Sequence, residues 1–377
     1  MHPSEQKIIL RKLKNKAGSH SPSPKEITAS LGYNPIKHDF CFLSNPYATD
    51  IVVEKFFSYF SDKKHIFSML ESYPASSSYV SKHIASFEGL QAENIVVGNG
   101  AIQAIEWVCN GWDLKNLLIP IPTFSTYYEL LSNRYVFSSE FWLSGNLTAK
   151  NLIELADKNK CDSILLIHPN NPTGEAMQLS ELKSLVENLG NKKLIIDESF
   201  SHFLINYEEF KSYRNNLSAS NVVFIKSMSK DFGIAGLRLG YLYTFDEALL
   251  NNALSKTTWN LNNFSVLFSE LLNDNDFVNH YMNARVQYLN DRDDFFTKLH
   301  SIKSLNVFPS QANFFLLKFD ANLLPELVFD LLIESGVYVR TMEDKVGLSN
   351  SYIRVASRRI DENKLFINAF KSLTVSY

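Results

Sequence analysis

Short apolar runs alternate with helix-patterned stretches through the middle of the chain. The runs cover residues 95–97, 117–122, 163–169, 193–199 and 221–227. Continuous apolar runs of this length, bounded by turn formers or charges, are typical of parallel strands that are buried on both faces. Segments with helical spacing of apolar residues, such as 101–110 and 180–189, separate them. The alternation predicts an α/β fold with a doubly wound, mostly parallel sheet.

The pattern changes after about residue 275. A long helical stretch, a strand, a second helix and two short strands follow, at 277–300, 310–319, 324–335, 337–340 and 351–357. We expect the N-terminal segment to pack with this smaller α+β domain, because chain termini often lie close together. Four parts are therefore expected: an N-terminal arm (1–30), a first piece of the small domain (31–60), a large domain (61–275) and the rest of the small domain (276–377).

Composition and charge argue against several classes of protein. The net charge of the 377-residue chain is −3, so no basic field favours nucleic acid. No apolar run approaches the roughly 20 residues of a membrane-spanning helix, and we expect no membrane partner. The basic N-terminal stretch lacks the apolar core and cleavage site of a secretory signal. Three cysteines without a CxxC pair predict a reducing, cytoplasmic compartment and no metal site.

Side chains suited to one ligand follow several of the expected strands. In an α/β sheet, ligands bind beyond the carboxyl ends of the strands, so the residues after each strand meet at one edge. The sequence places there two glycines at a helix start, an aromatic ring, an amide, an acid, two hydroxyls, a lysine and an arginine. These residues are Gly98, Gly100, Phe124, Asn171, Asp197, Ser227, Ser229, Lys230 and Arg238.

The chemistry of these side chains narrows the ligand. Glycines at a helix start let backbone amides approach an anion, and the hydroxyls with the arginine fork suit a phosphate. Lys230 lies near a cation in a partly buried place, which lowers an amine pKa and favours attack on an aldehyde. Asp197 ends an apolar strand and needs a cationic partner such as a pyridinium N–H, and Phe124 offers a face to a flat ring. These properties together describe pyridoxal 5′-phosphate (PLP).

Longer motifs occur in the order that is found in one enzyme family. They are HPNNPTG (168–174), IIDESF (195–200), SMSKDFGIAGLRLGY (227–241) and YIRVASR (352–358). With them, residues 40 to 370 resemble the fold-type I PLP-dependent enzymes of the class I/II aminotransferase group. The segments SNPY, SYP, VGNGA, PTF and SQANF resemble the branch that holds histidinol-phosphate aminotransferase and threonine-phosphate decarboxylase.

The resemblance implies a role for each matched residue. Lys230 would hold PLP as a Schiff base and then act as general acid and base, while Asp197 would keep the pyridine nitrogen protonated. Asn171 would donate to the 3′-oxygen of the ring, and Phe124 would stack on the ring. The expected ligands of the cofactor phosphate are Gly100, Ala101, Ile102, Ser227, Ser229 and Arg238.

The resemblance also implies a partner and substrate ligands. Tyr73 would reach the cofactor phosphate of a second subunit, which implies a homodimer. Arg354 would clamp the substrate carboxylate, and Arg340 and Arg358 are further candidates, since phosphate and carboxylate both accept an arginine fork. The peptide bond before Pro172 would be cis, as it often is in this family.

For the activity we expect an aminotransferase that acts on a small phosphorylated ketone or aldehyde, of the dihydroxyacetone-phosphate or imidazole-acetol-phosphate type. The alternative is a PLP-dependent decarboxylase of phosphothreonine or phosphoserine, which uses the same cofactor chemistry. One departure favours the alternative: many aminotransferases have Tyr three residues after the aspartate, and here the residue is Phe200. Intact Lys230 and Asp197 argue against a non-catalytic protein, and the missing GxGxxG argues against an NAD-dependent oxidoreductase.

Overall fold

The computed structural model describes residues 2–319 and 324–374, which divide into two compact units. The large unit contains Ser44–Asn171 and Glu175–Gln287. The small unit contains the residues up to Leu43, Pro172–Gly174 and the residues from Tyr288 onward. The division differs from the expected one at both ends. Helix α3 (Pro46–Tyr59) belongs to the large unit because Ala48 and Val52 are buried in its core.

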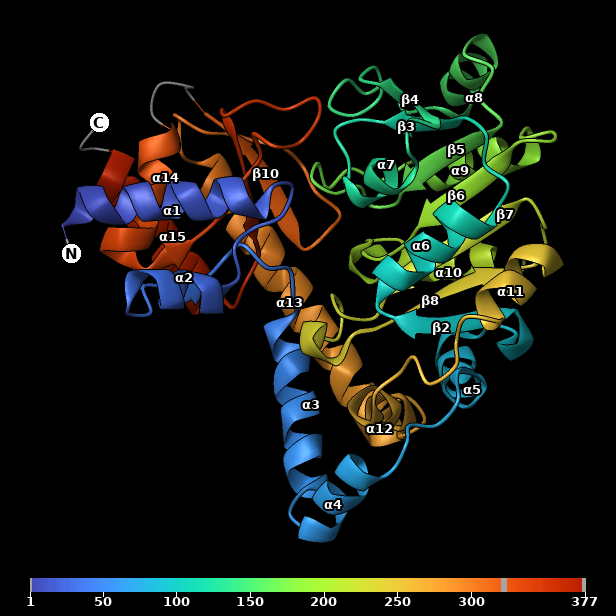
Figure 1. Cartoon of the computed structure of the whole chain (residues 1–377). Helices are drawn as coiled ribbons and strands as arrows, with labels where there is room; N and C mark the ends of the chain where they lie inside the picture. Colours follow the sequence, from blue (N-terminus) through green and yellow to red (C-terminus); the bar gives the residue numbers. More distant parts are fainter. Residues whose placement is uncertain (1, 320–323, 375–377) are drawn as a thin grey trace. The chain divides into compact units, whose positions relative to one another are not determined.

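The large unit is built on a seven-stranded sheet (Figure 1). Its strands are β2 (Ile95–Asn99), β3 (Leu117–Pro120), β4 (Tyr135–Ser138), β5 (Ser163–Ile167), β6 (Lys193–Asp197), β7 (Val222–Ser227) and β8 (Leu239–Thr244). The order across the sheet is β2-β8-β7-β6-β5-β3-β4. Strand β8 runs antiparallel to both of its neighbours, and the remaining pairs are parallel. The expected α/β fold with a mostly parallel sheet is therefore confirmed.

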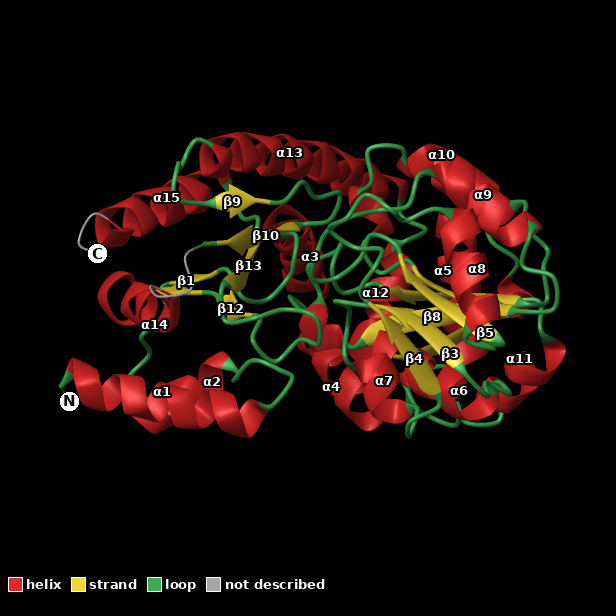
Figure 2. Cartoon of the chain, turned by 90° about the horizontal axis from the view of Figure 1, so that it is seen from above, coloured by secondary structure: helices red, strands yellow, loops and turns green. Residues whose placement is uncertain are grey.

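Both faces of this sheet are buried, which explains the continuous apolar runs. In β6, Leu194 and Ile196 pack into one hydrophobic cluster, while Ile195 between them packs into another. Helices α6, α7 and α11 cover one face, and α9 and α10 lie on the other (Figure 2). The helices of this unit, besides α3, are α4 (Lys63–Glu71), α5 (Ser77–Glu88), α6 (Ala101–Gly111), α7 (Thr126–Leu130), α8 (Ala149–Lys158), α9 (Leu179–Glu187), α10 (Tyr207–Asn215), α11 (Glu247–Leu254), α12 (Asn263–Leu271), and the short turns η1 (Ala92–Asn94), η2 (Ser201–Phe203) and η3 (Ala235–Leu237).

The small unit contains an antiparallel sheet of order β12-β13-β10-β9 and a parallel pair, β1 with β11. Its strands are β1 (His38–Asp39), β9 (Asn306–Val307), β10 (Phe314–Lys318), β11 (Val337–Tyr338), β12 (Arg340–Thr341) and β13 (Tyr352–Ala356). Its helices are α1 (Pro3–Ala17), α2 (Pro24–Leu31), α14 (Leu324–Ser335) and α15 (Ile360–Thr374), and α13 (Asn275–His300) crosses the boundary between the units.

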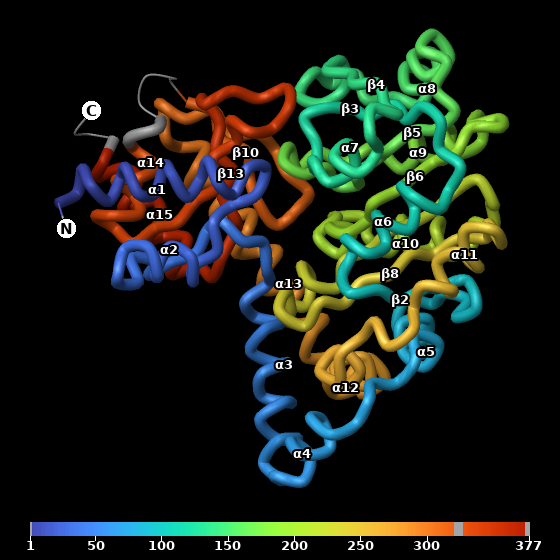
Figure 3. Tube along the Cα trace, viewed as in Figure 1, coloured from blue at the N-terminus to red at the C-terminus, as the bar shows by residue number. Residues whose placement is uncertain are grey.

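The N-terminal residues form two capped helices. Helix α2 begins at Pro24 because Ser23 and Glu26 form a capping box there. Leu10 of α1 and Ile27 of α2 share a hydrophobic cluster with Leu332 of α14. Figure 3 shows α1 beside α14, so the small unit combines N- and C-terminal segments, as expected.

Candidate functional site

The carboxyl ends of β5, β6 and β7 bring the expected site residues of the large unit together. Asp197 is the last residue of β6 and pairs in register with Ile167 of β5 and Ile225 of β7. Ser227 ends β7, and Lys230 follows three residues later. Strand β2 also points to this edge, because β8 is antiparallel to both β2 and β7. Gly100 and the start of α6 therefore emerge at the same edge.

Asp197 is almost fully buried, and Tyr127 and Ser199 donate hydrogen bonds to its carboxylate. Tyr127 donates its hydroxyl to Oδ2 at 2.9 Å, and the Ser199 amide donates to Oδ1 at 3.0 Å. Burial raises the pKa of Asp197, while Ser199, Tyr127 and the charge of Lys230 counteract part of that rise. A buried carboxylate of this kind gains from a cationic partner, as a pyridinium N–H would be. Sequence reasoning missed Tyr127, since nothing in the run Thr126-Tyr127-Tyr128 tells which ring turns inward.

The start of α6 and Arg238 form a cradle for an anion. Gly100 has a φ of +80°, which disfavours other residues, and a Cβ atom there would lie 2.4 Å from Arg238 Nη2, so the guanidinium packs directly against this glycine. Ser229 Oγ is buried and no group in the described part of the chain hydrogen-bonds to it. These groups fit the phosphate of PLP, because a helix N-terminus, an arginine fork and a hydroxyl with a free hydrogen-bonding position all bind phosphate.

Gly240 of β8 sets the position of this cradle. A Cβ atom on Gly240 would lie 2.5 Å from the amide nitrogen of Ala101 and 2.7 Å from the carbonyl oxygen of Lys226. Both neighbours are backbone, so no side chain can be accommodated without moving a strand or the start of α6. Gly240 lies in the LRLGY motif, but the motif by itself does not reveal this close approach of backbone segments.

Two loops that carry site residues are tied together by Asn170. This buried side chain accepts a hydrogen bond from Thr123 Oγ1 at 3.0 Å and donates to the carbonyl of Pro122 at 2.9 Å. The contact places the segment with Phe124 next to the segment with Asn171. Cis peptide bonds precede Pro122 and Pro169, and the bond before Pro172 is not among them. The prediction of a cis bond before Pro172 was therefore wrong.

A buried ionic network lies next to the segments that carry Asp197 and Lys230. Arg214 contacts Glu198 at 2.7 Å and Glu88 at 2.9 Å, and all three side chains are fully buried. Lys226 reaches Glu88 at 3.3 Å. Burial alone would raise the pKa of Glu88, but Lys226 and Arg214 hold it well below its usual value. Because Glu198 directly follows Asp197, the network anchors the end of β6.

His202 joins a second part of this network to the lysine segment. Its Nδ1 lies 2.9 Å from the carboxylate of Asp231, and its Nε2 lies 2.6 Å from the hydroxyl of Tyr207. Asp231 directly follows Lys230 in the chain. Among the described residues no group of three or more His, Cys, Asp and Glu side chains has the arrangement of a metal site.

The three candidate substrate arginines belong to the small unit and differ in their surroundings. Arg340 and Arg354 lie opposite each other in the antiparallel pair of β12 and β13. Arg340 is held by Asp344 through two contacts, at 2.6 and 2.8 Å. Arg354 donates to the carbonyl of Cys41 at 2.9 Å, and burial lowers its pKa to about 10, so it stays charged at neutral pH. Arg358 lies 3.4 Å from Glu362.

Tyr73 lies on the surface of the large unit. It is 76% exposed, and its ring stacks on Trp259 with 4.8 Å between the centroids.

In the described residues no helix is long and apolar enough to cross a membrane.

Comparisons with known proteins identify the family of this arrangement. Residues 47–365 match the family model of aminotransferase class I and II. The chain is 35% identical to L-serine phosphate decarboxylase Cj1436c of Campylobacter jejuni over 370 residues, 96% of this chain and 94% of the relative. It is 34% identical to L-serine phosphate decarboxylase of Sulfurospirillum multivorans, again over 96% and 94%.

Solved structures agree with the fold. A decarboxylase from Sulfurospirillum multivorans is similar with a TM-score of 0.90 at 32% identity, covering 98% of this chain and 96% of that one. Histidinol-phosphate aminotransferase from Clostridium acetobutylicum, at 24% identity and a TM-score of 0.77 over 90% and 99%, shows the shared fold alone.

These findings correct the expected activity. Amino transfer as the main reaction was wrong, since the two relatives at 34–35% identity over 96% of this chain and the structure at 32% identity are decarboxylases. The cofactor-binding motifs are common to both reactions, because the cofactor supplies the same electronics to each. They therefore could not separate the two.

Proposed function

The chain belongs to the class I and II aminotransferase family and depends on pyridoxal phosphate, and on this basis we propose that it decarboxylates O-phospho-L-serine. The products would be phosphoethanolamine and carbon dioxide. The observation that carries the proposal is the 35% identity to an L-serine phosphate decarboxylase over 96% of this chain. A phosphorylated amino acid substrate was the alternative expected from the sequence.

The large unit offers the groups that such a reaction needs at the cofactor. When bound, the cofactor withdraws the electron pair that is left at Cα as the carboxylate departs. Asp197, held by Tyr127 and Ser199, would keep the pyridine nitrogen protonated. Lys230 would hold the cofactor and afterwards deliver a proton to Cα.

The remaining cofactor ligands follow from the same edge of the sheet. Arg238, the start of α6 and the buried hydroxyl of Ser229 would hold the cofactor phosphate. Phe124 would lie against the ring and Asn171 would donate to its 3′-oxygen. Phe200 is only 3% exposed and has no hydroxyl, so the ring oxygen would have one donor fewer than in enzymes with tyrosine there.

Orientation of the substrate would decide which bond breaks. Fixed ligands for the two anionic ends of phosphoserine would determine which bond at Cα breaks, because they would hold one bond in the reactive orientation. Arg354 is our candidate for one end, because it is partly buried and stays charged at neutral pH. Arg340 and Arg358 remain candidates for the other end.

A second copy of the chain would complete the site as a homodimer. The large unit exposes several large apolar side chains, of which Tyr73 and Trp259 stack on each other. They are Phe57, Phe67, Leu70, Tyr73 and Trp259, each more than 60% exposed. Tyr73 would reach the cofactor phosphate of the other subunit.

All three cysteines are buried thiols, in line with a reducing, cytoplasmic location.

The test measures products directly. The PLP-loaded enzyme is incubated with phosphoserine, and phosphoethanolamine is followed by phosphorus NMR together with released carbon dioxide. We expect both products in equal amounts, less from phosphothreonine, and none from Lys230→Ala. Formation of 2-oxoglutarate from glutamate with conversion of the cofactor to its amine form, and no carbon dioxide from phosphoserine, would refute the proposal in favour of amino transfer.

A further inference from the structure

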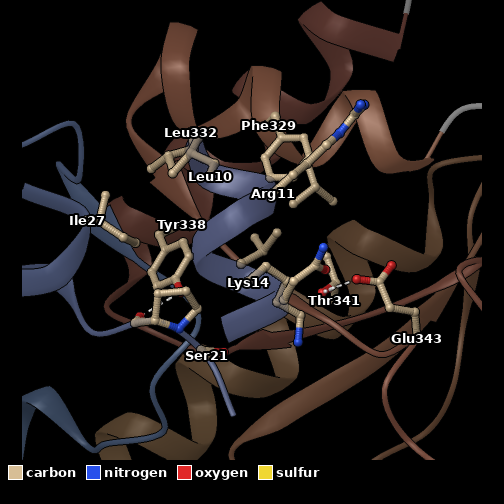
Figure 4. Close-up of a pocket in the computed structure, with 14 residues that line it drawn as sticks. Leu10, Arg11, Lys14, Ser21, Ile27, Phe329, Leu332, Tyr338, Thr341 and Glu343 are labelled. Carbon is tan, nitrogen blue, oxygen red and sulfur yellow. Dashed lines mark hydrogen bonds between the residues drawn. The ribbon is translucent and has the colours of Figure 1, made fainter. Parts of the chain in front are cut away.

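The small unit contains a cavity that has no part in the proposed cofactor or substrate site. Its volume is about 300 Å³, within the lower range of pockets that bind small molecules (Figure 4). Helix α1, helix α14, strands β11 and β12 and the residues before α2 surround it. None of its lining residues is a candidate ligand of PLP or of phosphoserine.

Most of the wall is apolar and includes two aromatic rings. Leu10, Ile27 and Leu332 line it together with Phe329 and Tyr338. The Tyr338 hydroxyl donates to the carbonyl of Pro22 at 2.8 Å, so its polar end is satisfied and its ring serves as wall. This part of the cavity suits a compact apolar group.

Two cationic side chains also line the cavity. Arg11 and Lys14 lie one helical turn apart on the same side of α1, and both line the cavity. Lys14 Nζ is 2.8 Å from Asp344, the same carboxylate that binds both ends of the Arg340 guanidinium and lies 3.4 Å from Lys345. Three cations thus share Asp344.

The electrostatics agree with an excess of positive charge. Burial lowers the pKa of Lys14 first of all, and the charge of the neighbouring Arg340 lowers it further, while Asp344 and Glu343 counteract part of this effect. Glu343 also lines the cavity, but it is exposed and its carboxylate accepts a hydrogen bond from Thr341. An anionic group beside Lys14 would reduce the repulsion among the three cations.

We propose that this cavity binds a small amphipathic anion. Its apolar body would lie against Phe329, Tyr338 and Leu332, and its carboxylate or phosphate would pair with Lys14 and Arg11. The site goes beyond the proposed function, and it depends only on residues of the small unit.

The experiment uses a matched pair of probes on the PLP-loaded enzyme. Isothermal titration calorimetry compares 3-phenylpropionate with its neutral counterpart 3-phenylpropan-1-ol. We expect the acid to bind with a Kd of about 1 mM or below and the alcohol to bind about tenfold more weakly. Decarboxylation of phosphoserine is measured separately, so failure of the proposed function leaves this result unaffected.

Variants locate the binding. Lys14→Met should abolish the preference for the acid, whereas Lys12→Met, an exposed lysine of the same helix outside the cavity, should preserve it. Leu332→Phe fills the cavity and should weaken the binding of both probes. If the melting temperature of Leu332→Phe is lower than that of the wild type, Leu10→Phe is used as the cavity-filling variant instead. No binding of the acid up to about 10 mM, equal binding of the alcohol, or binding unchanged in Lys14→Met and the filled variant would each overturn the proposal.

Discussion

Replacing Tyr127 by Phe tests the electrostatics on which the cofactor site rests. The substitution removes the 2.9 Å hydrogen bond to Asp197 from a fully buried position and leaves the donor at the Ser199 amide in place. Hydrogen bonds to charged groups contribute about 1.5–3 kcal/mol, and bonds to neutral groups about 1 kcal/mol. The loss of folding free energy in Tyr127→Phe should therefore depend on whether Asp197 is ionised.

Proton linkage determines whether the loss of folding stability in Tyr127→Phe grows or shrinks as the pH rises. Burial already raises the pKa of Asp197 in the folded chain, and Tyr127 is one of the groups that lower it again. Without Tyr127 the folded-state pKa rises further, while the unfolded-state pKa is unchanged. The folded variant then keeps its proton to higher pH, so its stability falls more than that of the wild type as the pH rises. The difference should be about 1 kcal/mol while Asp197 is protonated and should grow to about 1.5–3 kcal/mol above its pKa.

The assay is urea unfolding of the cofactor-free protein at pH 5 and pH 8, at one protomer concentration. Tyr135→Phe, a partly exposed tyrosine of β4, is the matched control and should show no such pH dependence. In an Asp197→Asn background, Tyr127→Phe should cost about 1 kcal/mol or less at both pH values. An equal loss at both pH values in the wild-type background would refute the reasoning.

Three further predictions concern the cradle, the buried network and the small unit. Gly240→Ala should raise the dissociation constant of PLP at least about tenfold in a spectroscopic titration, because its Cβ meets backbone at 2.5 Å, whereas Gly236→Ala, with nothing within 4 Å, should not. Arg214→Met should lower the free energy of unfolding by about 3–5 kcal/mol in denaturant, and adding Glu198→Gln should recover part of it; no recovery would contradict the pairing. Burial lowers the pKa of Lys345 to about 8, below its unfolded value, so the unfolded chain binds more protons between the two values. The wild type should gain up to about 3 kcal/mol relative to Lys345→Met as the pH rises from 8 toward 10, and parallel pH profiles would count against this.

Much of the fold is determined by local sequence. Parallel strands buried on both faces need uninterrupted apolar runs, so β5, β6 and β7 are recognisable from Ser163–Ile167, Lys193–Asp197 and Val222–Ser227 alone. Because ligands bind at strand carboxyl ends, the positions of Asp197 and Lys230 in the sequence already indicate the chemistry. Alternation and local order suffice for these conclusions, since both are properties of neighbouring residues.

The tertiary structure decided everything that depends on contacts between distant segments. The sequence did not reveal that β8 inserts antiparallel between β2 and β7, that Gly240 gives room to the start of α6, or that Tyr127 binds Asp197. Nor did it reveal that Asp344 holds Arg340, since an arginine in a strand shows its charge but not its partner. Such pairings depend on how the chain crosses itself, and side-chain spacing along one segment carries no record of that crossing.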